Sequence, residues 1–173
     1  ITEADQDWIY DPTPDFFYGI NFYFQYKGFD LTMFWQGIQG RDIISDLKKE
    51  TDLWSGLNIG FLNKGRRVLD AWTPNNPDSD IPALTRSDLN NEKRVSTYYV
   101  EDGSFLKLRN IQIGYNVPEQ ALQKIKMRKL RVYVSAQNLL TIKSRTFTGV
   151  DPENPNYGYP IPMNLTFGVN IGF

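Results

Sequence analysis

The sequence predicts an all-β protein in which five antiparallel strands form part of a larger transmembrane β-barrel. Three observations support this fold class. The last eleven residues alternate strictly between apolar and small or polar side chains, four earlier segments repeat that alternation, and short and long connections follow one another along the chain. A period of two gives each strand one apolar and one polar face, which suits a wall between lipid and water.

The closing segment, residues 163–173, has apolar residues at every odd position and small or polar residues at every even one. About ten residues is the length that a tilted strand needs to cross a bilayer. The segment resembles the closing strand of an outer-membrane barrel, whose terminal aromatic residue and alternating apolar residues are read by the barrel-assembly machinery. The expected assembly signal is Phe167, Val169, Ile171 and Phe173. An amphipathic strand of a soluble β-sandwich is the alternative.

The first two strands form a hairpin. Residues 16–26 alternate, Lys27-Gly28 is suited to a two-residue turn, and residues 29–36 alternate again. Such a turn pairs Tyr26 directly with Phe29. Both residues belong to the apolar faces of their strands, so the expected register is self-consistent.

Residues 37–102 are expected to be a long irregular connection, with a helical turn or two around residues 42–53. In the third strand, residues 104–116, the apolar phase slips from even to odd positions. A β-bulge near Arg109-Asn110 would return all its apolar residues to one face. Without a bulge, Lys107 or Arg109 would face lipid, at a cost of roughly 2–4 kcal/mol at the bilayer midplane.

Residues 117–129 carry Pro118 and Glu119 followed by basic residues, which predicts a short helix. Residues 130–142 form the fourth strand, in which Asn138 is the one polar residue on the apolar face. Residues 143–162 are a loop rich in Gly, Pro, Asn and Tyr.

The connections are therefore two, more than sixty, about thirteen and about twenty residues long. Outer-membrane barrels have short periplasmic turns and long extracellular loops. With a periplasmic C-terminus, every long connection becomes extracellular and every short one periplasmic. Because eight strands are the practical minimum for a barrel, residues 1–173 are expected to be the C-terminal part of a larger barrel, with the missing strands either on another chain or in another part of the same polypeptide.

Composition excludes several function classes. The formal net charge of −1 gives no global attraction to nucleic acid. With no Cys and no His, the chain has no disulfide, no Cys or His metal site and no Ser-His-Asp triad. Asp78-Ser79-Asp80 hints weakly at calcium, but Pro82 breaks the EF-hand spacing, so neither a metal nor a cofactor is expected. No run approaches eighteen apolar residues.

Four segments together resemble the SusC/RagA-type TonB-dependent outer-membrane transporters. They are S-T-Y-Y-V-E-D-G-S-F-L-K-L-R-N-I-Q-I-G-Y-N-V-P (residues 96–118), L-R-V-Y-V-S-A-Q-N-L-L-T from Leu130, W-T-P-N-N-P from Trp72, and the ending L-T-F-G-V-N-I-G-F. The resemblance covers nearly the whole chain. Gln137-Asn138-Leu139 belongs to the second motif, which makes Asn138 a family feature.

The resemblance implies a 22-stranded barrel in the outer membrane of a Gram-negative cell, with an N-terminal plug that this sequence lacks. It also implies a SusD-like surface lipoprotein over the extracellular mouth and a TonB complex that acts on the plug. The expected function is import of oligosaccharides or peptides, without catalysis. The rest of the barrel, the plug and outer-membrane lipid would be further partners.

Aromatic residues in the long loops are the candidate contacts for substrate or lid, because aromatic rings stack on sugars and anchor protein interfaces. They are Trp54, Trp72, Tyr98, Tyr99, Tyr157 and Tyr159. The alternative is that they form an aromatic girdle or pack the loops. Inward-facing Asp30, Lys107 and Arg131 are expected to contact the plug or water.

Two other functions stay open at this stage. The first is a soluble β-sandwich that binds carbohydrate, because the same alternation could face a protein core. The second is an enzyme that uses acidic residues of the long connection, such as Glu101 and Asp102, as a carboxylate pair. Dependence on detergent separates the barrel from both.

Overall fold

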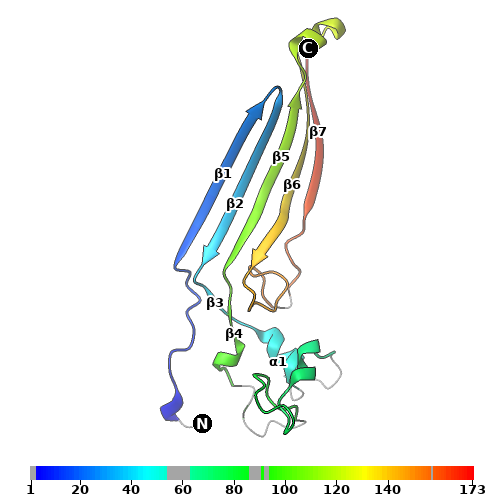
Figure 1. Cartoon of the computed structure of the whole chain (residues 1–173). Helices are drawn as coiled ribbons and strands as arrows, with labels where there is room; N and C mark the ends of the chain where they lie inside the picture. The colour runs from blue at the N-terminus through cyan, green and yellow to red at the C-terminus, as the bar shows by residue number, and fades with distance from the viewer. Residues whose placement is uncertain (1–2, 54–62, 86–90, 92–93, 157) are drawn as a thin grey trace.

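The computed structural model describes residues 3–53, 63–85, 91, 94–156 and 158–173. Its main feature is a five-stranded antiparallel sheet in the order β1-β2-β5-β6-β7 (Figure 1). Each strand pairs with its neighbour in the meander, and the bounds are β1 (Phe16–Tyr26), β2 (Phe29–Gln39), β5 (Phe105–Asn116), β6 (Lys129–Lys143) and β7 (Asn164–Gly172). The five predicted strands are confirmed, and β2 is three residues longer than predicted.

The hairpin between β1 and β2 has the predicted register, with Tyr26 opposite Phe29. Lys27 and Gly28 both have positive φ, +46° and +88°. Two central residues with positive φ define the tight hairpin turn whose twist matches that of the strands. The local sequence therefore sets both the turn and the pairing.

The predicted bulge in the third strand is confirmed. Against β2, the pairing shifts by one residue, so that Phe34 faces Asn110 while Trp35 faces Leu108, and Arg109 is the extra residue. Leu106 and Leu108 thus share a face with Ile111. A matching irregularity in β6 puts Asn138 at φ +52°, a left-handed conformation that Asn tolerates better than most residues. This conformation gives the physical reason for the polar residue at that position.

Directly opposed residues in the pairing register share a face of the sheet. One face, here called the apolar face, runs from Phe22 and Phe24 in β1 to Phe167 and Val169 in β7. Its side chains are largely exposed, with Phe167 at 76%. The opposite polar face carries Asp30, Gln112, Arg131, Ser135, Thr166 and their neighbours in register.

The two ends of the sheet differ. At the turn end lie the Lys27-Gly28 hairpin, the C-terminal Phe173, and a short helix made of α2 (Glu119–Leu122) and η4 (Gln123–Ile125), which confirms the helix predicted there (Figure 1). At the loop end lie the long connections. They contain β3 (Asp42–Ile44), α1 (Asp46–Asp52), η2 (Arg66–Asp70), η3 (Thr97–Tyr99) and β4 (Val100–Asp102), and η1 (Glu3–Asp5) precedes β1.

The prediction that residues 37–102 lack strands was wrong in part. Asp42–Ile44 pairs antiparallel with Val100–Asp102, so the start and the end of this connection form a second, two-stranded sheet. Three-residue strands are too short to show a recognisable alternation in sequence. The helical turn expected around residues 42–53 is confirmed as α1.

Most of the buried apolar residues gather at the loop end. They include Ile38, Ile43, Leu53, Ala71, Tyr99, Phe105 and Phe147, whereas Ala136 in mid-strand and Leu122 at the turn end are separate. No helix among the described residues is long and apolar enough to cross a membrane. The long connections thus have a small core of their own, placed at one end of the sheet.

Candidate binding surface at the loop end

The first long connection is shaped by caps and a short ladder. Ser45 is the N-cap of α1, and its hydroxyl accepts a hydrogen bond from the Lys48 amide at 3.3 Å. The Ser45 amide donates to the Tyr99 carbonyl at 2.8 Å, continuing the β3–β4 pairing. These contacts hold α1 beside the segment that leads into β5.

Asp52 closes α1 and organises the residues around it. Its buried carboxylate accepts hydrogen bonds from Arg67 Nε at 2.6 Å and from the Tyr98 hydroxyl at 2.7 Å. Burial, with the hydrogen bond to the Asp52 carboxylate, raises the pKa of the Tyr98 hydroxyl well above its ordinary value. Tyr98 is therefore a neutral donor at any physiological pH, and it ties η3 to α1.

Glu101 joins the two long connections to each other. Its carboxylate accepts hydrogen bonds from the Thr148 hydroxyl at 2.6 Å and the Thr148 amide at 3.0 Å, and Lys48 lies 3.3 Å away. Asp46 and Asn156 make a second cross-link, through one hydrogen bond in each direction. The described residues of the two long connections, within 40–104 and 144–162, are therefore one interlocked unit.

A charged cluster then fixes this unit to the sheet. The Lys107 ammonium, on the polar face of β5, lies 2.7 Å from Asp151 and also contacts Glu153. Arg109 contacts the same Glu153 and donates to Gln36 at 2.8 Å. The bulge places both cations on the polar face, where the last loop supplies their counterions.

The two loop carboxylates are held in the ionised state. Burial would raise the pKa of Asp151, but Lys107 and the amides of Glu153 and Ile161 together lower it below its usual range. Burial would also raise the pKa of Glu153, but Arg109 and Lys107 together lower it below its usual range. A buried ammonium, only 1% exposed, needs such partners because an uncompensated charge there is very costly.

The predicted contact residues are distributed unevenly over this unit. Tyr159 is 94% exposed and Trp72 is 42% exposed, so both offer ring surface to a ligand. Tyr98 is half-buried with its hydroxyl bound to Asp52, and Tyr99 is 2% exposed, so the chain itself encloses that ring. Trp54 and Tyr157 lie outside the described residues.

Sequence reasoning missed two features of this surface. Asp151 and Glu153, which hold the last loop on the sheet, were not singled out, although two carboxylates around one proline were a usable signal. Lys107 was expected to contact the plug or water, but it pairs with those two loop carboxylates instead. Trp8, an exposed aromatic residue that precedes β1, is a further candidate contact.

Asp30 and Arg131, also expected to face the plug or water, pair with each other. Arg131 donates to Asp30 at 2.5 and 3.1 Å, and Asn116 adds a hydrogen bond at 3.0 Å. The Arg131 guanidinium lies 5.1 Å from the Tyr133 ring centroid. A Cβ at Gly168 would come within 2.2 Å of that ring, so the glycine makes room for it.

The other acidic motifs have structural partners. Ser79 of Asp78-Ser79-Asp80 donates to the Asp70 carbonyl and accepts from the Ile81 amide, which shapes a turn. Among the described residues, no group of three or more acidic side chains could hold a metal ion. Of the suspected carboxylate pair, Glu101 is buried and fully bonded, and Asp102 accepts from the Ser104 amide at 2.8 Å.

The expected assembly signal lies at an edge of the sheet. Phe167, Val169 and Ile171 point to the apolar face of β7, and Phe173 follows the strand. All four side chains are more than half exposed. β7 pairs only with β6 among the described strands.

Comparison with known proteins decides the family. TonB-dependent receptor P3 of Formosa agariphila is 36% identical, and TonB-dependent receptor P26 of the same organism is 31% identical, each over 100% of this chain and 18% of the relative. The structure of the RagAB peptide importer in its open-open state superposes with a TM-score of 0.78 at 28% identity, over 95% of this chain and 18% of that one. The chain belongs to the SusC/RagA-type TonB-dependent receptors.

Further matches agree with this family. A structure of the RagAB peptide transporter gives a TM-score of 0.71 at 31% identity, over 86% of this chain and 16% of that one. No family model matches the chain. The chain spans about a fifth of the length of the receptors it matches. Its five-stranded sheet corresponds to part of the barrel of those receptors.

Proposed function

We propose that the receptor containing this segment imports nutrients across the outer membrane, driven by TonB. The proposal is carried by the match of the whole of this chain to part of TonB-dependent receptors, together with its fold match to part of the RagAB peptide importer. Peptides are the first substrate class, because the solved structures are those of a peptide importer. Oligosaccharides are the second.

In this proposal residues 1–173 form the C-terminal portion of the barrel. The long connections are extracellular and the C-terminus is periplasmic. The apolar face, exposed in this chain, contacts lipid, while the polar face lines the lumen and contacts the plug. A SusD-like lipoprotein covers the loop end, and the fold match to the RagAB peptide importer supports this part of the proposal.

Trp72 and Tyr159 are the proposed contacts for substrate or lipoprotein at the loop end, because their rings are accessible. Tyr98 and Tyr99 support the surface from within. The interlocked connections present these rings from a fixed frame, which lowers the entropy that is lost on binding.

The test is uptake of a labelled peptide mixture and of labelled oligosaccharides by cells with and without the receptor gene. Import that requires the gene and stops when the proton-motive force is collapsed supports the proposal. Equal uptake by the deletion strain for both substrate classes would refute it. Co-purification of a lipoprotein with the native receptor, and its loss in a Trp72→Ala, Tyr159→Ala variant, tests the contact residues.

A further inference from the structure

The two ends of the sheet carry opposite charge. Residues 26–30 and 114–131, at the turn end, contain six basic and two acidic side chains, whereas the rest of the chain contains thirteen basic and eighteen acidic side chains. The six cations are Lys27, Lys124, Lys126, Arg128, Lys129 and Arg131. A chain with a formal net charge of −1 therefore has a distinctly basic end.

Five of these cations are exposed and unpaired. Arg131 is bound by Asp30, but none of the other five lies within 4.0 Å of a carboxylate among the described residues. At the loop end, by contrast, Lys48, Arg67, Lys107 and Arg109 all have carboxylate partners. The unpaired charge at the turn end is available to an external anion.

Two of the cations lie on the lipid-facing side. The Lys27 ammonium is 5.2 Å from the ring centroid of Tyr26, which belongs to the apolar face. The Arg128 amide donates to the Gly172 carbonyl at 2.9 Å, so the β6–β7 ladder continues and sets Arg128 opposite Phe173. By the alternation of the strands, Arg128 therefore shares the apolar side with Leu130 and Ile171.

Aromatic rings border these cations on the side of the sheet. Tyr26, Phe29 and Tyr115 end the apolar face there, and the Phe29 and Tyr115 rings lie 4.6 Å apart. Aromatic girdles mark the depth at which lipid headgroups begin. Lys27 and Arg128 come directly beyond this border, at the headgroup level.

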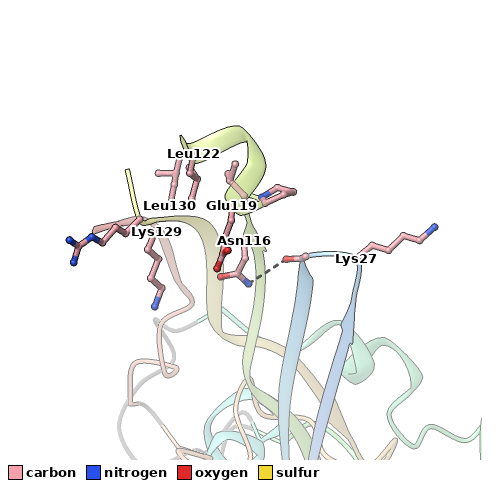
Figure 2. A pocket seen from close by; sticks show the side chains of 10 residues that line it. Lys27, Asn116, Glu119, Leu122, Lys129 and Leu130 are labelled. Carbon is pink, nitrogen blue, oxygen red and sulfur yellow. Dashed lines mark hydrogen bonds between the residues drawn. The ribbon is translucent and has the colours of Figure 1, made fainter. Parts of the chain in front are cut away.

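A pocket of about 470 Å³ opens between the two cations. It is lined by the Lys27-Gly28 turn, by residues 116–119 and Leu122, and by residues 128–130 (Figure 2). The Asn116 side chain contacts the Gly28 carbonyl across it. The Lys27 side chain extends outward from the rim of this pocket, so its ammonium is open to a headgroup beside the pocket rather than inside it (Figure 2).

We propose that the turn end binds the headgroups of anionic phospholipids in the periplasmic leaflet of the outer membrane, with Lys27 and Arg128 as the main contacts. This inference rests on the proposed import function only for the orientation of the barrel. Clustered cations beside a membrane-spanning segment attract acidic lipids, and each is a screened, salt-sensitive contribution. The headgroup anchor fixes the depth of this wall in the membrane.

The test uses the full-length receptor in mild detergent, titrated with phosphatidylglycerol and with phosphatidylcholine, and bound lipid counted by native mass spectrometry. We expect the Lys27→Gln, Arg128→Gln variant to bind phosphatidylglycerol roughly tenfold to thirtyfold more weakly at low salt, as two cations near an anionic surface would. Phosphatidylcholine binding should stay unchanged. The matched control is Arg66→Gln, Arg94→Gln, which removes two exposed cations from the loop end.

The Lys27→Arg, Arg128→Lys variant should keep wild-type affinity, because it keeps both charges. Equal phosphatidylglycerol binding by the turn-end variant and the control would overturn the inference. Displacement of phosphatidylglycerol by inorganic phosphate at equal concentration would also overturn it. A turn-end variant that still binds lipid but no longer binds an acidic periplasmic protein would overturn it as well. If the turn-end variant still takes up peptide and binds phosphatidylglycerol as the wild type does, this inference alone fails and the import function stands.

Discussion

In the five-stranded sheet, apolar side chains such as Phe24 and Phe167 are exposed, whereas at the loop end both apolar and charged side chains are buried. The loop end follows the rules of a water-soluble domain, with a small core and ion pairs that satisfy its buried charges. The sheet follows the rules of a barrel wall, whose apolar face is stabilised by lipid. One chain thus contains two regions that are adapted to two different solvents.

The charged cluster that joins the two regions gives the largest expected effect. Lys107→Met leaves Asp151 and Glu153 without their shared ammonium, and breaking a buried pair on one side costs about 3–5 kcal/mol. We expect residues 144–162 to become protease-sensitive and to lose hydrogen-exchange protection, while the amides of mid-sheet residues keep theirs. Lys129→Met, which removes an exposed cation at the other end of the sheet, should leave the protection of residues 144–162 unchanged. Equal loss of protection in both variants would contradict the conclusion that Lys107 holds this loop on the sheet.

The wall should respond to the face on which a charge is placed. Val134→Arg puts a cation on the apolar face in mid-strand, and we expect a loss of about 2–4 kcal/mol in the unfolding free energy of the receptor in lipid. Ser135→Arg, one residue along and on the polar face, should cost much less. Denaturant titration of both variants in liposomes measures the difference, and similar costs would mean that neither face is lipid-exposed.

Within the wall, close packing around Gly168 predicts a smaller effect. Gly168→Ala would bring a methyl group within 2.2 Å of the Tyr133 ring and should destabilise the barrel by about 1–3 kcal/mol. The double variant Gly168→Ala, Tyr133→Val removes the clash and should recover most of this loss. Gly172→Ala, whose nearest side-chain neighbour would be Lys129 Cβ at 3.2 Å, is a matched control in the same strand. If the destabilising effects of the two substitutions simply add in the double variant, the Tyr133 ring does not pack against residue 168.

The smallest expected effect is a response to acid that is confined to the loop end. The pKa values of Asp151 and Glu153 are lowered in the folded protein, so their ionised forms stabilise it above the unfolded carboxyl pKa of about 4. This stability is lost as the pH falls below about 4 towards the folded values. Hydrogen exchange between pH 7 and 3 should show residues 144–162 loosening before the sheet; loosening that begins near pH 6 would point to another group.

The sheet could be predicted closely because its information is local. The period of two sets the faces, Lys27-Gly28 sets the turn, and the phase slip in β5 is found as a bulge at Arg109. The sequence showed Asn138 as the one polar residue on the apolar face of the fourth strand, but it gave no physical reason for a polar residue there. Its left-handed conformation became apparent only when β6 was aligned with β5.

The sequence by itself determined the five strands, the register of the hairpin and the family, because these depend on patterns of residues that are neighbours along the chain. The tertiary structure decided the pairing of β3 with β4, the bond between Glu101 and Thr148, and the cluster of Lys107 with Asp151. Those contacts join residues that are 44 to 60 positions apart along the chain. Long-range partners leave no local periodicity, so only the folded chain reveals which charges meet.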